Sequence, residues 1–498
     1  MKAPNLDRLK GHALTIEGRA FTVIGVTQRN AAGFSPPLTR IEVHAAPALR
    51  VDLALPMEWN GRLYMTGNGG YAGEAFDNPL QEMGRAKALA GGYAVISTNT
   101  GHDEAADPLA AFATDREKLI DYAHRAVHQA AMVGKALVQE IYARPPEYTY
   151  FEGCSTGGRQ ALMAAQRYPE DFDGIISGCP VLDFTGSQLW GVRTGQFLAG
   201  VDIGDREMEI LSSVLHTRFG AREGRSPELI DNPIGADFDV ARDVPISADG
   251  EPAEGSLTRT QAEALAKVYA PAPIGGGRTF PGLPIGGEAI GGGLPGVAPA
   301  SGWAGWLYPS DEGFFAGAPA GVRVSFGETF LREMLGYRGR WQDFDYSDGA
   351  MAGVEELSAL LNATDPDLGP LAKEDGKLIL YHSAADVAVN PARTVEYYES
   401  IRAEMGDRAD ACIRFYLAPG MFHCFGGYGP DQFDMLPALV DWVEHGKSPA
   451  TIIASQRPNP SDPQDVWTRP LCPYPAIAKY DGQGDPASAG SYACVSPH

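Results

Sequence analysis

The chain has 498 residues, of which 44% are apolar and 21% charged, a composition typical of soluble globular proteins. Its length has room for roughly two or three ordinary domains, or for one large domain with an insertion. Its formal net charge of −23 repels phosphate backbones and anionic membrane surfaces, and no apolar run approaches the length of a membrane span. We therefore expect neither nucleic acid nor membrane as a partner, but a small substrate that is neutral or carries a single charge.

The first part of the chain predicts a sheet that changes character along its length. Residues 20–56 alternate apolar and polar positions, which is typical of antiparallel strands. From residue 61 the pattern becomes strand, loop and helix: residues 62–67 and 93–101 predict strands, and residues 116–142 carry helical spacing. This alternation indicates a mostly parallel sheet with helices on both faces, so the expected fold class is α/β.

Residues 153–158 read GCSTGG and stand at a strand–helix junction, because residues 147–153 predict a strand and residues 157–169 a helix. The G-x-S-x-G pattern alone is weak in a chain with 60 glycines. A strand before it and a helix after it are typical of a nucleophile elbow, and a merely structural turn would need neither. In an elbow the Oγ of Ser155 is exposed on a sharp turn, and the N–H of Thr156 faces the developing oxyanion.

The strand–helix pattern continues with a strand expected over residues 172–180 and then stops. Residues 183–363 lack it, and the stretch 271–296 packs Gly and Pro too densely for a regular element. Trp303 and Trp306 follow this stretch directly, and a flexible linker rarely carries aromatic residues so close by. We therefore expect an ordered but irregular inserted domain.

The pattern resumes near the C-terminal end. Residues 377–386 and 412–424 each predict a strand followed by a loop, and residues 434–446 predict a closing helix with Gly446 as its cap. The chain is thus expected to form a core in two parts, residues 1–182 and 364–498, with the inserted domain, residues 183–363, between them.

A serine nucleophile needs a base, and the base needs a carboxylate that orients it. In a sheet of this kind the acid and then the histidine follow the serine in the chain, each on a loop after a late strand. Asp386 and His423 stand at these positions. His382 ends a strand and is expected in the core, and His102 lies on a loop near the catalytic edge, where it could at most support the site.

A cysteine accompanies each of the two expected catalytic loops: Cys154 directly precedes Ser155, and Cys424 directly follows His423. Two interpretations stand. The thiols could be two buried free cysteines, or they could form a disulfide, which requires their Cα atoms to lie within roughly 4.4–6.8 Å of each other. The matched flanking favours the disulfide, which would join the two loops.

Three segments give the chain a resemblance to a known family. They are GCSTGGRQAL, LLNATDPDLGPLAKEDGKLILYHSAADVAVNP and PGMFHC, and together they resemble the tannase and feruloyl esterase family, which includes hydrolases of terephthalate monoesters. The likeness extends over most of the chain, from WNGRLYMTGNGGYAG to RPLCPYP.

The resemblance implies an α/β-hydrolase core with a large lid inserted between late strands. It implies that Ser155 is the nucleophile, His423 the base and Asp386 the orienting acid. It further implies disulfides that join Cys154 to Cys424 and Cys472 to Cys494. The loop GNGGYAG matches the second half of the oxyanion hole, which points to Gly69 or Gly70 without a choice between them.

The sequence departs from the family at the calcium loop that the family's lids usually carry. In the matching stretch, residues 220–233, Gly220 and Pro227 stand where aspartates belong, and Glu223 takes the middle position. Calcium prefers several charged oxygens, so we expect no metal, or only weak calcium binding, and no other cofactor. Cys179 and Cys412 have no evident partners and are expected as buried thiols.

These features predict a carboxylic ester hydrolase that acts through an acyl-enzyme on small esters of aromatic acids of the galloyl, feruloyl or terephthaloyl type. Two alternatives stand: an acyltransferase with the same triad, and a hydrolase-like binding protein without catalysis. Two disulfides would require an oxidising compartment. Since the first twenty residues lack the apolar core of a secretion signal, we expect a periplasmic or secreted protein whose signal is absent from this sequence. The oligomeric state is not set by these features.

Overall fold

The computed structural model describes residues 6–220, 229–247, 253–288, 302–308, 321–457 and 465–496. Its main feature is a ten-stranded sheet in the order β1-β2-β3-β4-β6-β5-β7-β8-β11-β12. Neighbouring strands are antiparallel from β1 to β6 and parallel from β6 to β12, as the sequence predicts. The strands span Ala13–Ile16 (β1), Arg19–Arg29 (β2), Leu38–Ala45 (β3), Leu49–Pro56 (β4), Arg62–Thr66 (β5), Ala94–Thr98 (β6), Tyr148–Cys154 (β7), Gly174–Gly178 (β8), Lys377–Ser383 (β11) and Ile413–Ala418 (β12).

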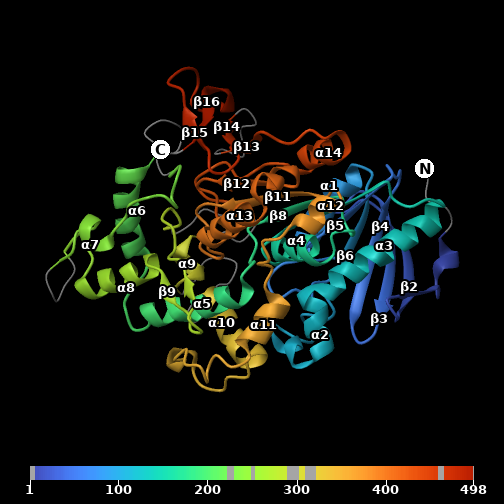
Figure 1. Cartoon of the computed structure of the whole chain (residues 1–498), viewed down its shortest axis with the longest axis horizontal. Coiled ribbons are helices and arrows are strands. Elements are labelled where there is room, and N and C mark those ends of the chain that lie inside the picture. The colour runs from blue at the N-terminus through green and yellow to red at the C-terminus, as the bar shows by residue number, and fades with distance from the viewer. Residues whose placement is uncertain are drawn as a thin grey trace.

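Helices cover both faces of this sheet (Figure 1). Alternate strand residues face opposite sides, so each face builds its own apolar cluster. Phe151 of β7 joins the cluster beneath α3 and α4, whereas its neighbour Tyr150 joins the cluster beneath α1 and α14. The helices of the core span Pro79–Ala90 (α1), Arg116–Ile120 (α2), Ala126–Tyr142 (α3), Thr156–Arg167 (α4), Gly369–Lys373 (α12), Pro391–Met405 (α13) and Leu436–His445 (α14), and Gly446 caps α14 in the left-handed conformation as expected.

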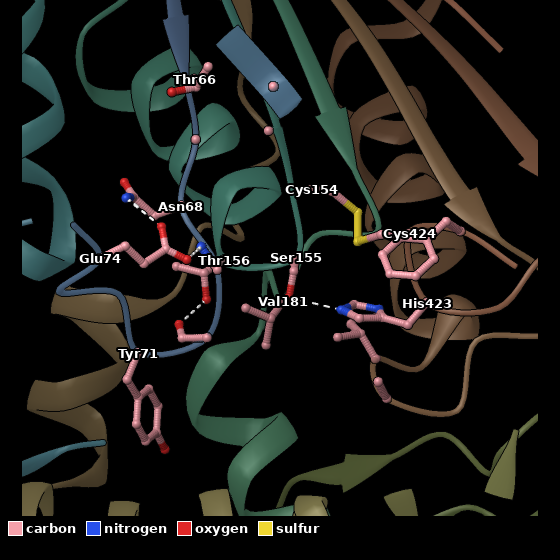
Figure 2. Close-up of a pocket in the computed structure, with 18 of the residues that line it drawn as sticks. Thr66, Asn68, Tyr71, Glu74, Cys154, Ser155, Thr156, Val181, His423 and Cys424 are labelled. Atoms are coloured by element: carbon pink, nitrogen blue, oxygen red, sulfur yellow. Dashed lines mark hydrogen bonds between the residues drawn. A yellow bond between two sulfur atoms is a disulfide. The ribbon is translucent and has the colours of Figure 1, made fainter. Parts of the chain in front are cut away.

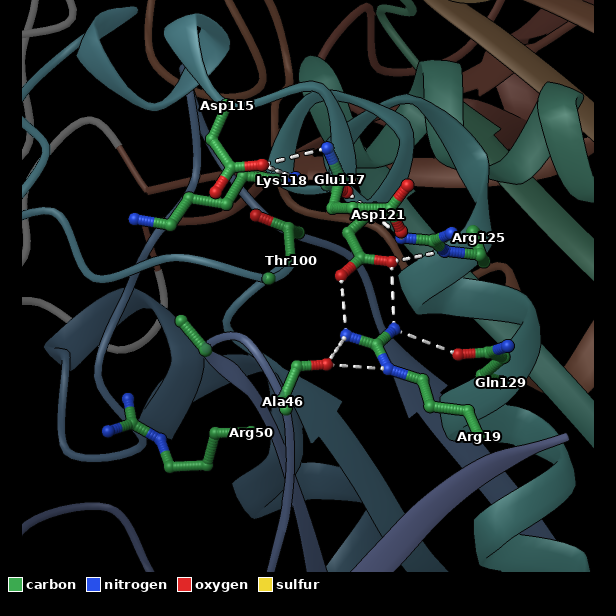
Figure 3. Close-up of polar contacts among 12 residues, drawn as sticks. Arg19, Ala46, Arg50, Thr100, Asp115, Glu117, Lys118, Asp121, Arg125 and Gln129 are labelled. Carbon is green, nitrogen blue, oxygen red and sulfur yellow. Dashed lines mark hydrogen bonds and ion pairs between the residues drawn. The ribbon is translucent and has the colours of Figure 1, made fainter. Parts of the chain in front are cut away.

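The single helix expected over residues 116–142 is interrupted by one π-helical turn, Asp121–Arg125. Asp121 is fully buried there and accepts hydrogen bonds from both Nη atoms of Arg19 at 2.9 Å and from Nε of Arg125 at 2.6 Å (Figure 3). Gly101 packs so closely that a Cβ on it would lie 2.4 Å from the Cβ of Asp121. These tertiary contacts tie β2 to the helix and outweigh the regular helical spacing of the sequence.

Between β8 and β11 the chain adds no strand to the large sheet within the described residues. The expectation of an irregular segment here is wrong in part, because much of the described chain is helical, and these helices gather beside one edge of the sheet (green and yellow in Figure 1). The elements are Phe184–Leu198 (α5), Asp205–Phe219 (α6), Val240–Asp243 (α7), Arg259–Tyr269 (α8), Ala272–Pro273 (β9), Thr279–Phe280 (β10), Trp303–Trp306 (α9), Val322–Thr329 (α10) and Val354–Leu361 (α11).

Glycines hide the helical pattern of α5 in the sequence. A Cβ on Gly191 would lie 2.9 Å from the carbonyl oxygen of Arg323, and a Cβ on Gly195 would lie 2.4 Å from a methyl group of Val324. The two glycines therefore serve the close approach of α5 and α10 rather than a loop. The extent of the lid domain, residues 183–363, stays a prediction.

The C-terminal part forms two small antiparallel pairs beyond the sheet, at the top of Figure 1. Among the helices of the described residues, none has the length and apolar character that a membrane span requires. The strands of the two small C-terminal pairs span Ile452–Gln456 (β13), Trp467–Leu471 (β14), Ile477–Tyr480 (β15) and Tyr492–Val495 (β16).

Candidate active site

Ser155 lies between the last residue of β7 and the first residue of α4, as the elbow motif predicts. Its φ of 64° and ψ of −121° place it in a region that non-glycine residues rarely occupy, which costs about 1–3 kcal/mol. Gly153 and Gly157 make this turn possible, since a Cβ on Gly153 would lie 2.6 Å from the carbonyl carbon of Gly157. The motif glycines are thus required by close backbone contact.

The structure brings the two other expected catalytic residues to the serine (Figure 2 shows Ser155 and His423). Nε2 of His423 lies 2.9 Å from Oγ of Ser155, and Nδ1 of His423 lies 2.7 Å from Oδ2 of Asp386. Asp386 follows β11 and His423 follows β12, so the parallel strands deliver both loops to one edge of the sheet. This is the hydrogen-bond chain that a serine nucleophile, a base and an orienting acid require.

Asp386 is held in place by the backbone as well as by histidines. Its Oδ1 accepts the N–H groups of Ala388 and Val389, each at 2.9 Å, and the side chain is fully buried. Burial alone would raise the pKa of Asp386, but His423 and His382 outweigh it and hold the pKa well below its usual range. Asp386 is therefore a fixed carboxylate that faces the imidazole of His423.

His382 is buried as expected, but its contact with Asp386 is not evident from the sequence. Nε2 of His382 lies 3.3 Å from Oδ2 of Asp386, and its Nδ1 lies 2.8 Å from Oγ1 of Thr394. In the sequence, only the spacing of four residues between His382, at the end of a strand, and Asp386, on the loop after it, could have indicated this contact. His102 is buried and stacks on Phe112 at a centroid distance of 4.1 Å, and burial lowers its pKa to about 4.

The two glycines expected at the oxyanion hole differ in their hydrogen bonding. The N–H of Gly69 donates to Oε1 of Glu74 at 3.1 Å and is thereby engaged. Among the described residues, the N–H groups of Gly70 and Thr156 have no hydrogen-bond acceptor. The carbonyl oxygen of Gly70 accepts the hydroxyl of Thr156, which fastens the two candidate donors to each other. Gly70, rather than Gly69, is therefore available for an oxyanion.

Glu74 organises this loop and was not identified from the sequence. Besides the N–H of Gly69, its carboxylate accepts Nδ2 of Asn68 at 3.0 Å and Nε2 of Gln81 at 2.6 Å (Figure 2 shows Asn68 and Glu74). Burial raises the pKa of Glu74, although these three donors offset part of the rise. An acid directly after the Gly-rich loop of residues 67–73 was the only signal for this role.

Both expected disulfides are present. Cys154 and Cys424 are bonded with a Cα–Cα distance of 6.1 Å, and Cys472 and Cys494 with a distance of 5.6 Å. The first disulfide joins the serine loop to the histidine loop, beside both residues (Figure 2). Cys179 and Cys412 are buried thiols, and burial raises their pKa values to about 12 and about 11. Neither is poised as a nucleophile.

A cavity of about 500 Å³ contains the exposed part of this site. Figure 2 shows Ser155 in its middle, with Tyr71 on one side and Thr66 on the other. The side toward α5 and α10, here called the lid lobe, is lined by Tyr71, Phe184, Trp306, Arg323 and Phe326. The side toward α1, here called the core lobe, is lined by Tyr64, Lys87, Glu152 and Tyr381.

Trp306 connects the lid lobe to the histidine. Its ring packs edge-on against that of His423 at a centroid distance of 5.7 Å. Tyr71 packs against Phe326 at 4.9 Å and donates its hydroxyl to the carbonyl oxygen of Phe326 at 3.0 Å. Residues of the inserted segment therefore form a wall of the cavity that reaches the serine.

The degraded calcium loop lies mostly outside the described residues, which resume at residue 229, so the expectation for Glu223 and Pro227 is not tested. The carboxylate of Asp231, in the described end of this stretch, lies 2.5 Å from Nη2 of Arg469. That carboxylate is engaged by a protein cation. The expectation of no cofactor also stays a prediction.

Comparison with known proteins places the chain in a family. A family profile described as "Tannase and feruloyl esterase" matches residues 35–495. The mono(2-hydroxyethyl) terephthalate hydrolase of Piscinibacter sakaiensis is 31% identical over 502 aligned residues, which cover 90% of this chain and 82% of that protein. A probable feruloyl esterase of Arthroderma benhamiae is 28% identical over 92% of this chain and 84% of that protein.

Solved structures show the same fold. Feruloyl esterase B from Aspergillus oryzae has a TM-score of 0.80 at 23% identity, with 97% of this chain and 98% of that chain covered. The tannin acyl hydrolase from Aspergillus niger has a TM-score of 0.73 at 21% identity, with 99% and 93% covered. Together with the sheet order, this likeness confirms the expected α/β-hydrolase fold, and the family confirms a carboxylic ester hydrolase. The chain belongs to the tannase and feruloyl esterase family.

Proposed function

We propose that the protein is a serine hydrolase that cleaves esters of aromatic acids through an acyl-enzyme on Ser155. The observation that carries the proposal is the unbroken chain of contacts from Oγ of Ser155 through His423 to the buried carboxylate of Asp386, located at a cavity. A buried acid that contacts an imidazole, which in turn contacts a serine hydroxyl at a cavity, is the arrangement that activates a nucleophile.

In the first half-reaction, Nε2 of His423 takes the proton of Ser155 as Oγ forms a bond to the ester carbonyl carbon. The negative charge that develops on the carbonyl oxygen is held by the N–H groups of Gly70 and Thr156. His423 then delivers its proton to the alkoxy oxygen while the carbon–oxygen bond to the alcohol breaks. Asp386 keeps the imidazole in the required tautomer and stabilises its cationic form.

In the second half-reaction, a water molecule takes the place of the alcohol. His423 removes a proton from this water as its oxygen adds to the acyl carbon, and the bond to Oγ of Ser155 then breaks. The proton returns to Oγ, and the free carboxylic acid leaves. No step requires a metal ion or an organic cofactor.

The aromatic rings of the lid lobe support an aromatic acid as the acyl part. Tyr71 packs against Phe184 at a centroid distance of 5.7 Å and against Phe326 at 4.9 Å, and aromatic side chains of this kind favour a flat aryl group. Two relatives are named feruloyl esterase B and mono(2-hydroxyethyl) terephthalate hydrolase, and both names refer to esters of aromatic acids. We therefore assign the acyl group to the lid lobe.

We further propose that the protein works in an oxidising compartment, in the periplasm or outside the cell. The support is the pair of disulfides, which reducing cytosol would not maintain.

A panel of methyl gallate, methyl ferulate and mono(2-hydroxyethyl) terephthalate tests the proposed function. The wild type should hydrolyse at least one of them, and the Ser155→Ala variant should lose this activity. Undiminished hydrolysis by Ser155→Ala would contradict the mechanism. Ester formation with an added alcohol in preference to hydrolysis would identify an acyltransferase instead, and binding of aryl esters without turnover would identify a binding protein.

A further inference from the structure

The core lobe of the cavity holds a carboxylate that the reaction as described does not use. Glu152 belongs to β7 and lies three residues before Ser155. Because strand residues alternate between faces, Glu152 and Cys154 share one face of the sheet, and the cavity passes along both. Three residues of strand span about 10 Å, so Glu152 lies within reach of a group attached to a bound ester.

Glu152 has few partners for a half-buried acid that lines a cavity. Its Oε2 accepts the hydroxyl of Tyr64 at 2.7 Å, and this is the one hydrogen bond to its carboxylate within the described residues. No described cation lies within 4 Å of it, and the nearby Lys87 pairs with Asp434. Burial raises the pKa of Glu152, and Lys87 and Tyr64 offset this only in part. A carboxylate that is partly withdrawn from water is stabilised by further hydrogen-bond donors.

A second polar group faces the same lobe without a partner. The hydroxyl of Tyr381 has no hydrogen bond within the part of the chain that the structure describes, although Tyr381 lines the cavity. Glu152 lines the same cavity. An acceptor and a donor that line one lobe can together bind hydroxyl groups, which both donate and accept hydrogen bonds.

The position of His423 indicates which part of an ester enters this lobe. The acyl and alkoxy parts lie on opposite sides of the carbonyl carbon, and His423 must deliver its proton to the alkoxy oxygen. Cys424 and Phe425, the residues after His423, line the cavity together with Glu152. An alcohol that leaves from beside His423 therefore extends past the disulfide toward the core lobe.

We propose that the core lobe is the binding site for the alcohol part of the substrate, and that Glu152, with Tyr64 and Tyr381, selects alcohols that carry a further hydroxyl group. This inference rests on the proposed function and deepens it. A methoxy group is too short to reach the carboxylate, whereas a polyol places a hydroxyl within hydrogen-bond distance. The site thus gives specificity on the side of the leaving group.

The test compares the propyl and the 2,3-dihydroxypropyl esters of one aromatic acid. In the wild type, kcat/KM for the dihydroxypropyl ester should exceed that for the propyl ester roughly tenfold or more, since a hydrogen bond to a carboxylate is a strong one. In Glu152→Leu this ratio should fall close to one. Since each variant is measured on the same two esters, their difference in intrinsic reactivity cancels between variants.

A second variant and a matched control separate a loss of the hydroxyl contact from a general effect of misfolding. Glu152→Gln keeps the shape and the bond to Tyr64 but loses the charge, so the ratio should fall by a smaller factor. Glu444 offers the control, because its carboxylate also accepts a tyrosine hydroxyl, that of Tyr150 at 2.7 Å, but does not line the cavity. Glu444→Gln should keep the ratio of the wild type.

The outcomes separate this inference from the function on which it rests. If the wild type hydrolyses both esters with equal kcat/KM, or if neither Glu152 variant changes the ratio, the proposed subsite is wrong and the hydrolase stands. If the wild type hydrolyses neither ester nor any ester of the panel above, both the proposed ester hydrolysis and the proposed alcohol subsite are wrong.

Discussion

Replacing Asp386 by asparagine should reverse one hydrogen bond without changing the size of the side chain. Oδ1 of Asp386 accepts the N–H groups of Ala388 and Val389, so the amide oxygen of the asparagine must take this position. The amide nitrogen then replaces Oδ2 and donates to Nδ1 of His423, which in the wild type lies 2.7 Å from Oδ2. The imidazole proton is thereby moved to Nε2, where it blocks acceptance of the proton of Ser155.

The expected loss follows from the role of the tautomer. A wrong tautomer in a Ser-His-Asp triad lowers kcat about 10⁴-fold, which corresponds to about 5 kcal/mol of transition-state stabilisation. The backbone contacts of Oδ1 persist in the variant, so its thermal unfolding should change little by comparison. The assay measures kcat and KM on one aryl ester, together with the melting temperature of each variant.

Asp171 provides a matched control, because its carboxylate lies 2.7 Å from Nδ1 of His128 in a pair that does not line the cavity. Asp171→Asn should keep the kcat of the wild type. If Asp386→Asn also stayed within tenfold of the wild type while folded, the orientation of His423 by Asp386 would not matter for the reaction, and the reasoning would be refuted.

Three further variants probe the surroundings of the site. Cys154→Ser opens a disulfide between residues 270 apart, for which the chain-entropy model gives about 6 kcal/mol, so both the free energy of unfolding and kcat should fall. Full activity would show that the disulfide is dispensable for catalysis. Glu74→Ala frees the loop that holds Gly70 and should lower kcat about 10²-fold with little change in KM; a kcat within threefold of the wild type would contradict its positioning role. Burial raises the pKa of Glu288 from an ordinary value of 4.5 to about 7, so the protonated acid stabilises the fold at low pH, and on the order of 3 kcal/mol is lost as the pH rises from 4.5 to 7. Glu288→Gln should remove this pH dependence in denaturant titrations, and an unchanged dependence would rule out Glu288 as its source.

The main sheet and the meeting of Ser155, His423 and Asp386 were predictable because each left a local pattern. The elbow at Ser155 has a strand before it and a helix after it, and Asp386 and His423 each follow an apolar strand. These signals depend on residues close together in the chain. The pairing of Cys154 with Cys424 was indicated because one cysteine directly precedes Ser155 and the other directly follows His423.

Features that depend on contacts between distant segments were not predictable. The π turn at Asp121 depends on Arg19, about a hundred residues earlier, and the helix α5 was hidden by glycines that serve its contact with α10. The choice of Gly70 over Gly69 depends on Glu74, whose carboxylate engages one of two chemically identical N–H groups. The π turn, the helix α5 and the hydrogen bonding of Gly69 are all determined by tertiary contacts, which a single sequence does not reveal.

The most direct test of the central claim is mass spectrometry of the protein after reaction with a slowly hydrolysed aryl ester and rapid acid quenching. The account predicts one acyl group per chain, on the peptide that contains Ser155, and none in the Ser155→Ala variant. The His423→Ala variant should acylate far more slowly. An acyl group on another residue, or wild-type turnover by Ser155→Ala, would contradict the account.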